Sequence, residues 1–140
     1  MSTILDIADA VTASLNGGPF DPILGAERRY QPTFELPDLA DLKVSVVPKS
    51  VEVTNATRES GYFDCAIDIG VQKKIADEAE IDALVNLVEQ IADHLRQKRL
   101  DSFPDAAFVS IANEPVFAPE HLDQQRVFTS VLTVTYRVRR

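Results

Sequence analysis

The strongest constraint on the fold comes from residues 62–72, where apolar and polar side chains alternate. One face of this segment is apolar and consists of Phe63, Cys65, Ile67, Ile69 and Val71. The opposite face carries Asp64, Asp68 and Gln72. Alternation with a period of two is typical of a strand that buries one face. The sequence therefore predicts a half-buried strand here, and the apolar face of that strand must pack against a second layer.

A long amphipathic helix is predicted at residues 81–100, after an acidic linker at residues 77–80. Its apolar residues recur at helical spacing over about four turns: Ile81, Leu84, Val85, Val88, Ile91, Ala92 and Leu95. Acidic Asp82 near its start and basic Arg96 and Arg99 near its end complement the helix dipole. Burying this stripe against a sheet would contribute on the order of ten kcal/mol before chain entropy is subtracted. We therefore expect the helix to pack on the sheet.

The N-terminal part of the chain adds a second helix and a less regular region. Apolar residues at helical spacing predict a first helix of about three turns. Thr3 with Asp6 forms a plausible capping pair for it, and Gly17-Gly18 stops it. Residues 26–36 suit a short or edge strand interrupted at Pro32, because proline cannot donate to a sheet ladder.

Four further β segments complete the predicted sheet. Residues 43–48 and 51–58 suit a hairpin with a turn at Lys49-Ser50, and residues 107–114 and 127–138 suit two later strands. Both faces of the last segment carry β-branched or aromatic residues, which would allow one face to meet another subunit. Together the patterns predict an α+β fold in a single domain spanning residues 1–140. Its mainly antiparallel sheet would have about five or six strands, with two helices packed on one face.

Composition limits the partners of this domain. The 140 residues carry a formal net charge of -8, and such a surface repels phosphate backbones unless its basic residues form one patch. No apolar run approaches the roughly 20 residues of a membrane span, and the N-terminus lacks the basic region of a secretion signal. Cys65 is the only cysteine, which excludes an internal disulfide and fits a reducing compartment. We expect a cytoplasmic protein without specific nucleic-acid binding or membrane contact.

Groups able to perform a reaction are sparse in the sequence. His94 on the long helix and His121 in the last loop have no partner pattern. The simpler interpretations are a solvated helix residue for His94 and a hydrated loop for His121, although acids near His121 would suit a metal. Asp64 and Asp68 would lie roughly 13 Å apart along their strand, too far to share one metal ion without other ligands. We expect no catalytic residue, no metal ion and no cofactor.

Two alternatives to a structural role remain at the level of sequence. A small metal-dependent hydrolase or nuclease would need Asp64, Asp68, His94 and His121 to converge within about 5 Å in one cleft. A stand-alone protein-binding module would recruit a partner strand to a sheet edge, for which an exposed, unpaired terminal strand would be suited.

Element order and strand texture along most of the chain carry a family resemblance. The relevant features are a short N-terminal helix, Glu27-Arg28-Arg29-Tyr30 followed by Pro32 and Phe34, the Val46-Val47-Pro48 strand end, Arg58, the long helix, and the terminal strand at residues 131–136. With these features the chain resembles small virion-morphogenesis proteins of tailed bacteriophages and prophages, most closely the tail terminator or head-tail joining (minor tail) proteins. The resemblance includes no catalytic motif.

That resemblance implies a structural protein that works through assembly. Its partners would be other copies of itself in a ring, usually a hexamer, together with phage tail-tube and head-connector proteins. It would act in the bacterial host cytoplasm during virion assembly and then in the virion tail. In a ring that conducts DNA, net negative charge would let the duplex slide rather than adhere.

The resemblance also directs attention to residues that would contact an adjacent subunit. The candidates are Arg28, Arg29, Tyr30, Phe34, Arg58 and Arg137. The alternative for the arginines is an ordinary solvated position, and the alternative for the two aromatic residues is a place in the core.

Overall fold

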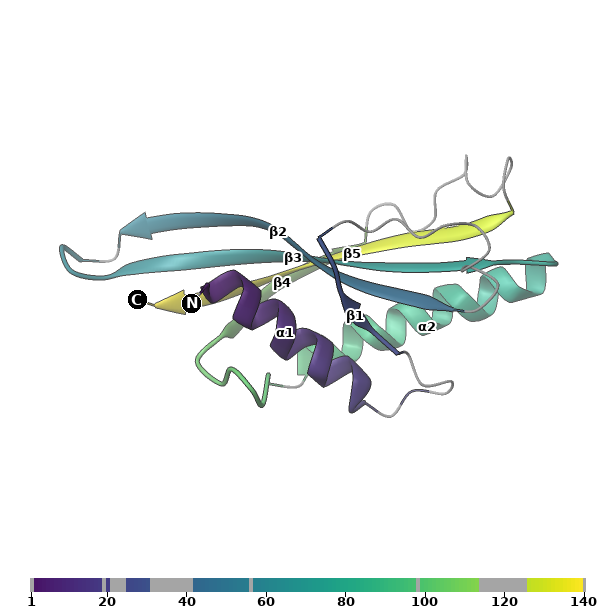
Figure 1. Ribbon diagram of the computed structural model, residues 1–140, viewed down its shortest axis with the longest axis horizontal. Coiled ribbons are helices and arrows are strands. Elements are labelled where there is room, and N and C mark those ends of the chain that lie inside the picture. Colours follow the sequence, from purple (N-terminus) through teal and green to yellow (C-terminus); the bar gives the residue numbers. More distant parts are fainter. Residues whose placement is uncertain are drawn as a thin grey trace.

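The computed structural model describes residues 2–18, 20, 25–30, 42–55, 57–97, 99–113 and 126–139. Within these ranges the chain forms two helices and five strands, in the order α1 (Thr3–Asn16), β1 (Glu27–Arg28), β2 (Lys43–Asn55), β3 (Gly61–Lys74), α2 (Glu78–Gln97), β4 (Ala107–Asn113) and β5 (Val127–Arg139). The long strands run along the molecule, and both helices lie on the same side of them (Figure 1). None of the described helices is long and apolar enough to cross a membrane.

The five described strands form one sheet in the order β1-β2-β3-β5-β4. Antiparallel pairs join β2 to β3, β3 to β5 and β5 to β4, whereas the two-residue β1 is parallel to β2. The predicted α+β architecture with a mainly antiparallel sheet is therefore confirmed. The terminal strand β5 lies between β3 and β4, so it is an interior strand and not the exposed edge that a strand-recruiting module would use.

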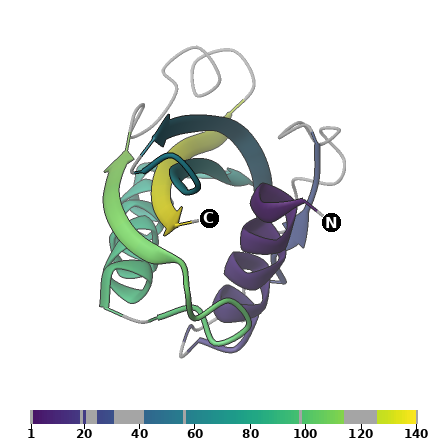
Figure 2. The same cartoon turned by 90° about the vertical axis from the view of Figure 1, so that its left-hand side faces the viewer.

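The core lies between one face of the sheet and the two helices (Figure 2). The predicted apolar face of β3 is buried at Cys65, Ile67, Ile69 and Val71. The helices add the buried side chains Ile7, Val11 and Leu15 of α1 and Leu84, Leu87, Val88, Ile91 and Leu95 of α2. Each large aliphatic side chain that is fully buried contributes about 1.5 to 3 kcal/mol. Packing of the helices on the sheet is therefore the main source of stability.

The helix ends differ from the predicted ends by a few residues. Ser2, and not Thr3, is the N-cap of α1, while Gly17 ends the helix as predicted, and its N–H donates to the carbonyl of Ala13 at 3.0 Å. α2 begins at Glu78, inside the acidic run predicted as a linker. The carboxylate of Asp77 accepts the N–H of Glu80 at 3.2 Å because the first N–H groups of a helix have no partner within it. The acidic run is therefore part of the helix start.

The predicted turn at Lys49-Ser50 is wrong, because β2 continues through it as one strand of 13 residues. The register shifts between Pro48 and Ser50, which marks a β-bulge. Proline cannot donate to the ladder, and a bulge accommodates it without ending the strand. The hairpin instead joins β2 to β3.

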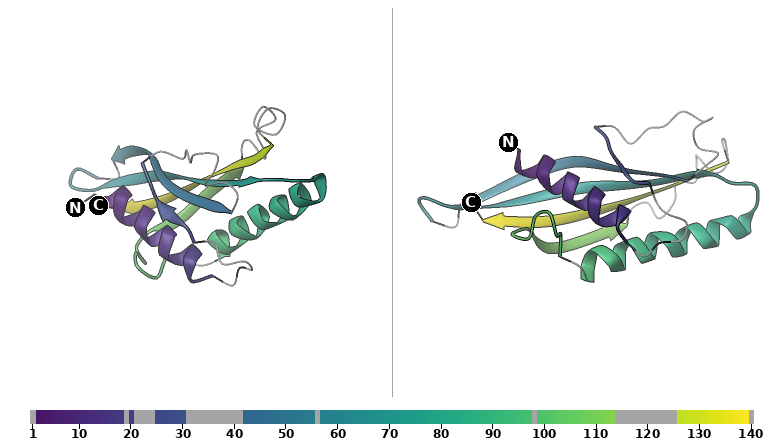
Figure 3. Two further views of the ribbon diagram at one scale, coloured as in Figure 1. Left: turned by 45° about the vertical axis from the view of Figure 1, so that its right-hand side comes forward. Right: turned by 60° about the horizontal axis from the view of Figure 1, so that its bottom comes forward.

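The outer part of this hairpin projects beyond the helical layer (Figure 3). The helix that packs on β2 and β3 is α1, whose 14 residues span about 21 Å. β3 also has 14 residues, but an extended chain of that length spans about 48 Å. A helix and a strand of equal residue number therefore differ in length, and neither described helix covers the outer end of the strand pair.

Candidate interaction surface

The candidate residues of a hydrolase or nuclease do not come together among the described residues. Asp64 and Asp68 lie on the face of β3 opposite the buried Cys65 and Ile67, whereas His94 lies on α2 on the helical side. The described ranges contain no group of three or more His, Cys, Asp or Glu side chains that could hold a metal ion. His121, the fourth candidate, lies outside these ranges.

His94 is not the solvated helix residue expected from the sequence. Its Nε2 lies 3.1 Å from the hydroxyl oxygen and also 3.1 Å from the carbonyl oxygen of Ser14 on α1. Its ring meets the ring of Phe20 edge-on, with 5.2 Å between centroids. His94 therefore joins the two helices. Sequence reasoning missed this role because its partner lies 80 positions earlier in the chain.

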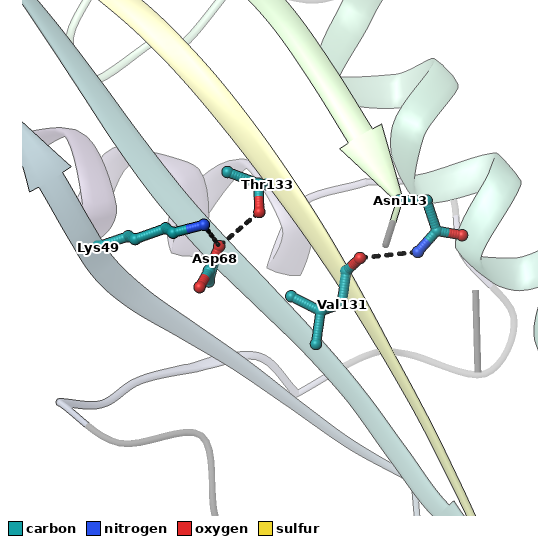
Figure 4. Close-up of polar contacts among 5 residues, drawn as sticks. All are labelled: Lys49, Asp68, Asn113, Val131 and Thr133. Atoms are coloured by element: carbon teal, nitrogen blue, oxygen red, sulfur yellow. Dashed lines mark hydrogen bonds and ion pairs between the residues drawn. The ribbon is translucent and has the colours of Figure 1, made fainter. Parts of the chain in front are cut away.

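The side of the sheet that faces away from the two described helices carries paired polar side chains. We call it the polar face, and it consists of Lys49 of β2, Tyr62, Asp64 and Asp68 of β3, and Thr133 and Arg137 of β5. At its centre, Asp68 accepts a 2.6 Å hydrogen bond from the hydroxyl of Thr133. The ammonium group of Lys49 approaches the same carboxylate at 3.9 Å (Figure 4). One carboxylate therefore links three neighbouring strands.

A second pair on the polar face involves the predicted interface residue Arg137. Its Nε and Nη2 donate to the two carboxylate oxygens of Asp64 at 2.7 and 3.0 Å. This hydrogen bonding lowers the pKa of Asp64, because it favours the charged carboxylate. The guanidinium also lies 5.1 Å from the ring centroid of Tyr62. Arg137 is thus oriented by its own chain while its side chain remains 47% exposed.

The predicted residues Arg28, Arg29 and Tyr30 form a cluster beside β1. Arg28 binds the carboxylate of Asp9 on α1 through a 2.6 Å contact and lies 5.1 Å from the ring centroid of Tyr30. The backbone N–H of Arg29 donates to the carbonyl of Val46 at 2.9 Å. Tyr30 itself is 71% exposed and therefore does not complete the core.

The candidate interface residues do not gather in one place. Arg58 is exposed in the turn of the β2–β3 hairpin, and Phe34 lies outside the described residues. Arg58 follows β2, and Arg137 lies in the part of β5 that pairs with the β2–β3 hairpin. Arg28, Arg29 and Tyr30 lie in β1 or directly after it. The structure thus places the described candidates in two groups and not in one site.

Two strands expose apolar side chains that sequence reasoning did not single out. Val51 and Val53 of β2 are 42% and 57% exposed, and Val109 of β4 is 45% exposed. Val51 lies opposite the buried Cys65, so its side chain is on the helix side of the sheet, where a core residue would be expected. The predicted length of the first helix could have indicated this exposure, because a helix of about three turns is too short to cover a strand of this size.

An apolar groove of about 380 Å³ lies between α2 and the start of β2. Aliphatic side chains of Leu42, Leu84 and Leu87 line it, together with the ion pair between Lys73 and Glu80 at 3.5 Å. Glu80 also accepts the backbone N–H of Ala76, and this bond lowers the pKa of its carboxyl group. The charged groups of the groove are thus engaged with each other and with the backbone.

Comparison with known proteins identifies the fold. The sequence matches no protein-family model and no curated protein. Among solved structures, a chain of the "Virion of native gene transfer agent (GTA) particle" aligns over 100% of both chains, with a TM-score of 0.67 and 16% sequence identity. The two chains share one fold.

Proposed function

We propose that this protein is a structural subunit of a phage-like virion. The observation that carries the proposal is its full-length likeness to a chain of the gene transfer agent virion. The alignment covers 100% of both chains, so the likeness is not limited to one part of the fold. The likeness in fold agrees with the independent resemblance of the sequence to phage morphogenesis proteins.

Within this class we propose a ring-forming tail terminator or head-tail joining subunit. A ring requires two different surfaces on each copy, so that one copy binds the next head to tail. The sheet offers such a pair, because its two edges are formed by different strands. One edge is formed by β2 with the short β1, and the other by β4. Tail-tube and head-connector proteins would then bind the two faces of the ring.

The proposed contacts with neighbouring proteins include the arginine and aromatic candidates from the sequence. Tyr30 and Arg58 are exposed and lie in different parts of the molecule, which suits contacts with different partners. Arg28, Arg29 and Arg137 have partners within the chain, so their contribution would come from preorganised side chains. Phe34 remains a candidate from its sequence alone.

We also propose that the role is not enzymatic. The support is the separation of the sparse reactive groups, since Asp64 and Asp68 lie on one side of the sheet and His94 on the other. General acid–base catalysis requires such groups within hydrogen-bond reach of one substrate.

The proposal is tested by measuring the assembly state of the purified full chain. Light scattering after gel filtration, at increasing protein concentration, is expected to show an oligomer of defined mass. Negative-stain electron microscopy of the same sample is expected to show rings with a central hole. A protein that stays monomeric at every concentration, and that does not bind tail tubes of its own particle, would overturn the ring proposal.

A further inference from the structure

The two edges of the sheet, at β2 and at β4, match each other in length, direction and side chains. The ring proposal alone does not require this match. β1 pairs with β2 at Ser45 and Val46, so residues 49–55 of β2, the β2 edge, have no strand partner on that side within the described ranges. On the other side, residues 107–113 form β4, the β4 edge, whose neighbour in the described sheet is β5. The outer side of an edge strand presents backbone N–H and C=O groups that can pair with another strand.

The two edges agree in length and direction. The β4 edge has seven residues, which equals the length of the segment 49–55. β2 is antiparallel to β3, β3 to β5 and β5 to β4, so β2 and β4 run in opposite directions. If the sheet of one copy continued into the next with the helices on the same side, these edges would meet as an antiparallel pair about 24 Å long.

Side chains along the two edges also match. An end-to-end alignment of the segments sets Asn55 opposite Ala107. It also sets Val53 opposite Val109, which lies at the β4 bulge between Phe108 and Ser110. The same register sets Val51 opposite Ile111, and both of these residues lie on the helix side of the sheet. The described residues expose four large hydrophobic side chains, and three of them, Val51, Val53 and Val109, would be covered by this pairing.

The composition of β4 points in the same direction. Natural proteins commonly protect a free edge strand with charged residues or proline, because an unprotected edge pairs with other strands. β4 has the sequence AFVSIAN, which contains neither, so its protection is limited to the bulge between Phe108 and Ser110. A strand that remained exposed to water in the working protein would be expected to carry such protection.

We infer that the β4 edge of one copy pairs with the β2 edge of the next copy, so that one sheet continues through neighbouring subunits. This inference rests on the proposed ring assembly and specifies its contact. The contact is heterologous, since each copy uses one edge to bind and leaves the other edge for a further copy. The twist between paired strands rotates each subunit relative to the last, which allows the series to close.

A disulfide test examines the register directly. Paired residues in an antiparallel ladder have Cα atoms about 4.5 to 5.5 Å apart, which suits a disulfide. The double variant Val51→Cys/Ile111→Cys avoids the bulge of β4 at Val109. It is made in a Cys65→Ala chain, because Val51 lies opposite Cys65. Oxidised as the full chain, it is expected to give a ladder of covalent oligomers on a non-reducing gel. Each single variant in the same chain is the matched control and is expected to stop at a dimer, since it carries one thiol.

A charge test examines the same contact without new thiols. Val53→Glu is expected to weaken association by about tenfold or more, because the carboxylate loses its water in the pairing. Val109→Lys in the same chain is expected to restore association by placing an opposite charge across the contact. Ala13→Glu adds the same charge to an exposed position of α1 and is expected to leave association unchanged. Circular dichroism checks that each variant is folded.

The outcomes separate this inference from the proposed function. Rings that form without cross-linking of the double cysteine variant, and that tolerate Val53→Glu, would overturn the edge pairing while the ring proposal stands. A wild-type chain that stays monomeric under all conditions would overturn both the edge pairing and the ring proposal. This holds even if another protein binds the two edges. Covalent ladders combined with loss and rescue of association would establish the pairing.

Discussion

Ile67 and Ile69 of β3 pack toward the helices, while Asp64 and Asp68 of the same strand lie on the polar face. The first pair is fully buried among aliphatic side chains. The second pair is held by directed contacts, with Arg137 for Asp64 and with Thr133 for Asp68. Neighbouring residues of one strand thus depend on different forces, non-directional burial on one face and hydrogen bonding beside water on the other.

The covered face of the sheet contributes most of the stability, and the polar face and the edges are open to contact with other molecules. Burial of a large side chain contributes more free energy than a partly exposed polar pair, whose attraction competes with water and with side-chain entropy. Substitutions on the covered face should therefore change the free energy of unfolding strongly. Substitutions on the polar face and at the sheet edges should leave folding nearly intact and alter contacts with other molecules.

The largest expected effect comes from the covered face. Ile69→Ala should lower the free energy of unfolding by about 2 to 5 kcal/mol, because it removes buried methyl groups and leaves a cavity. Urea denaturation followed by circular dichroism measures the change. A loss below the cost of the neighbouring Asp68→Ala would contradict the division between the two faces.

A smaller effect is expected from that neighbour on the polar face. Asp68→Ala removes the acceptor for Thr133 and the charge facing Lys49, and should cost about 1 kcal/mol. The same urea titration measures it, with Thr133→Val as the matched removal of the donor. If Asp68→Ala destabilised the protein as much as Ile69→Ala, the polar face would have to be counted as part of the core.

Tyr136 tests a polar atom placed on the covered face. Its hydroxyl is buried and has no hydrogen-bond partner among the described residues. Tyr136→Phe should therefore leave the free energy of unfolding unchanged or raise it by up to about 1 kcal/mol. Burial also raises the pKa of this phenol above its ordinary value. In the unfolded chain the phenol ionises at about pH 10. The free energy of unfolding of the wild type should therefore fall as the pH rises through that value.

Removal of this phenol should therefore reduce the alkaline loss of stability. Urea titrations of the wild type and of Tyr136→Phe at neutral and alkaline pH make the comparison. An equal alkaline loss in both proteins would show that the Tyr136 phenol is not the group responsible.

The smallest effect is expected from the Asp64–Arg137 pair. Because Arg137 lowers the pKa of Asp64 in the folded chain, the pair stabilises the protein above the ordinary carboxyl pKa of about 3.9. This stabilisation is lost as the pH falls through the lowered pKa of the folded state. Arg137→Gln should raise the pKa of Asp64, as measured by NMR titration of the carboxyl carbon. An unchanged midpoint would mean that the arginine does not set this titration.

Much of the fold could be predicted because its signals are local. The alternation around Ile67 and the helical stripe around Ile91 identified β3 and α2, since one face of each is buried. The turn predicted at Lys49-Ser50 failed because proline is compatible with both a turn and a bulge. Only the pairing partner of β2 distinguishes the two.

Less of the candidate surface could be predicted. Arg137 was selected from the sequence, yet its bond with Asp64 joins residues 73 positions apart. Val51 was predicted only as the start of a β segment, and its exposure results from the limited reach of α1 over the hairpin. These properties depend on which segments lie together, and residue type alone does not specify them.

The element types, the α+β class and the scarcity of reactive groups follow from the order of the amino acids, because periodicity and composition act within a few neighbouring residues. The strand order, the role of His94 between the helices and the exposure of the valines at the sheet edges depend on the three-dimensional packing. The physical reason is that burial depends on what covers a side chain, and the covering element here comes from a distant part of the chain.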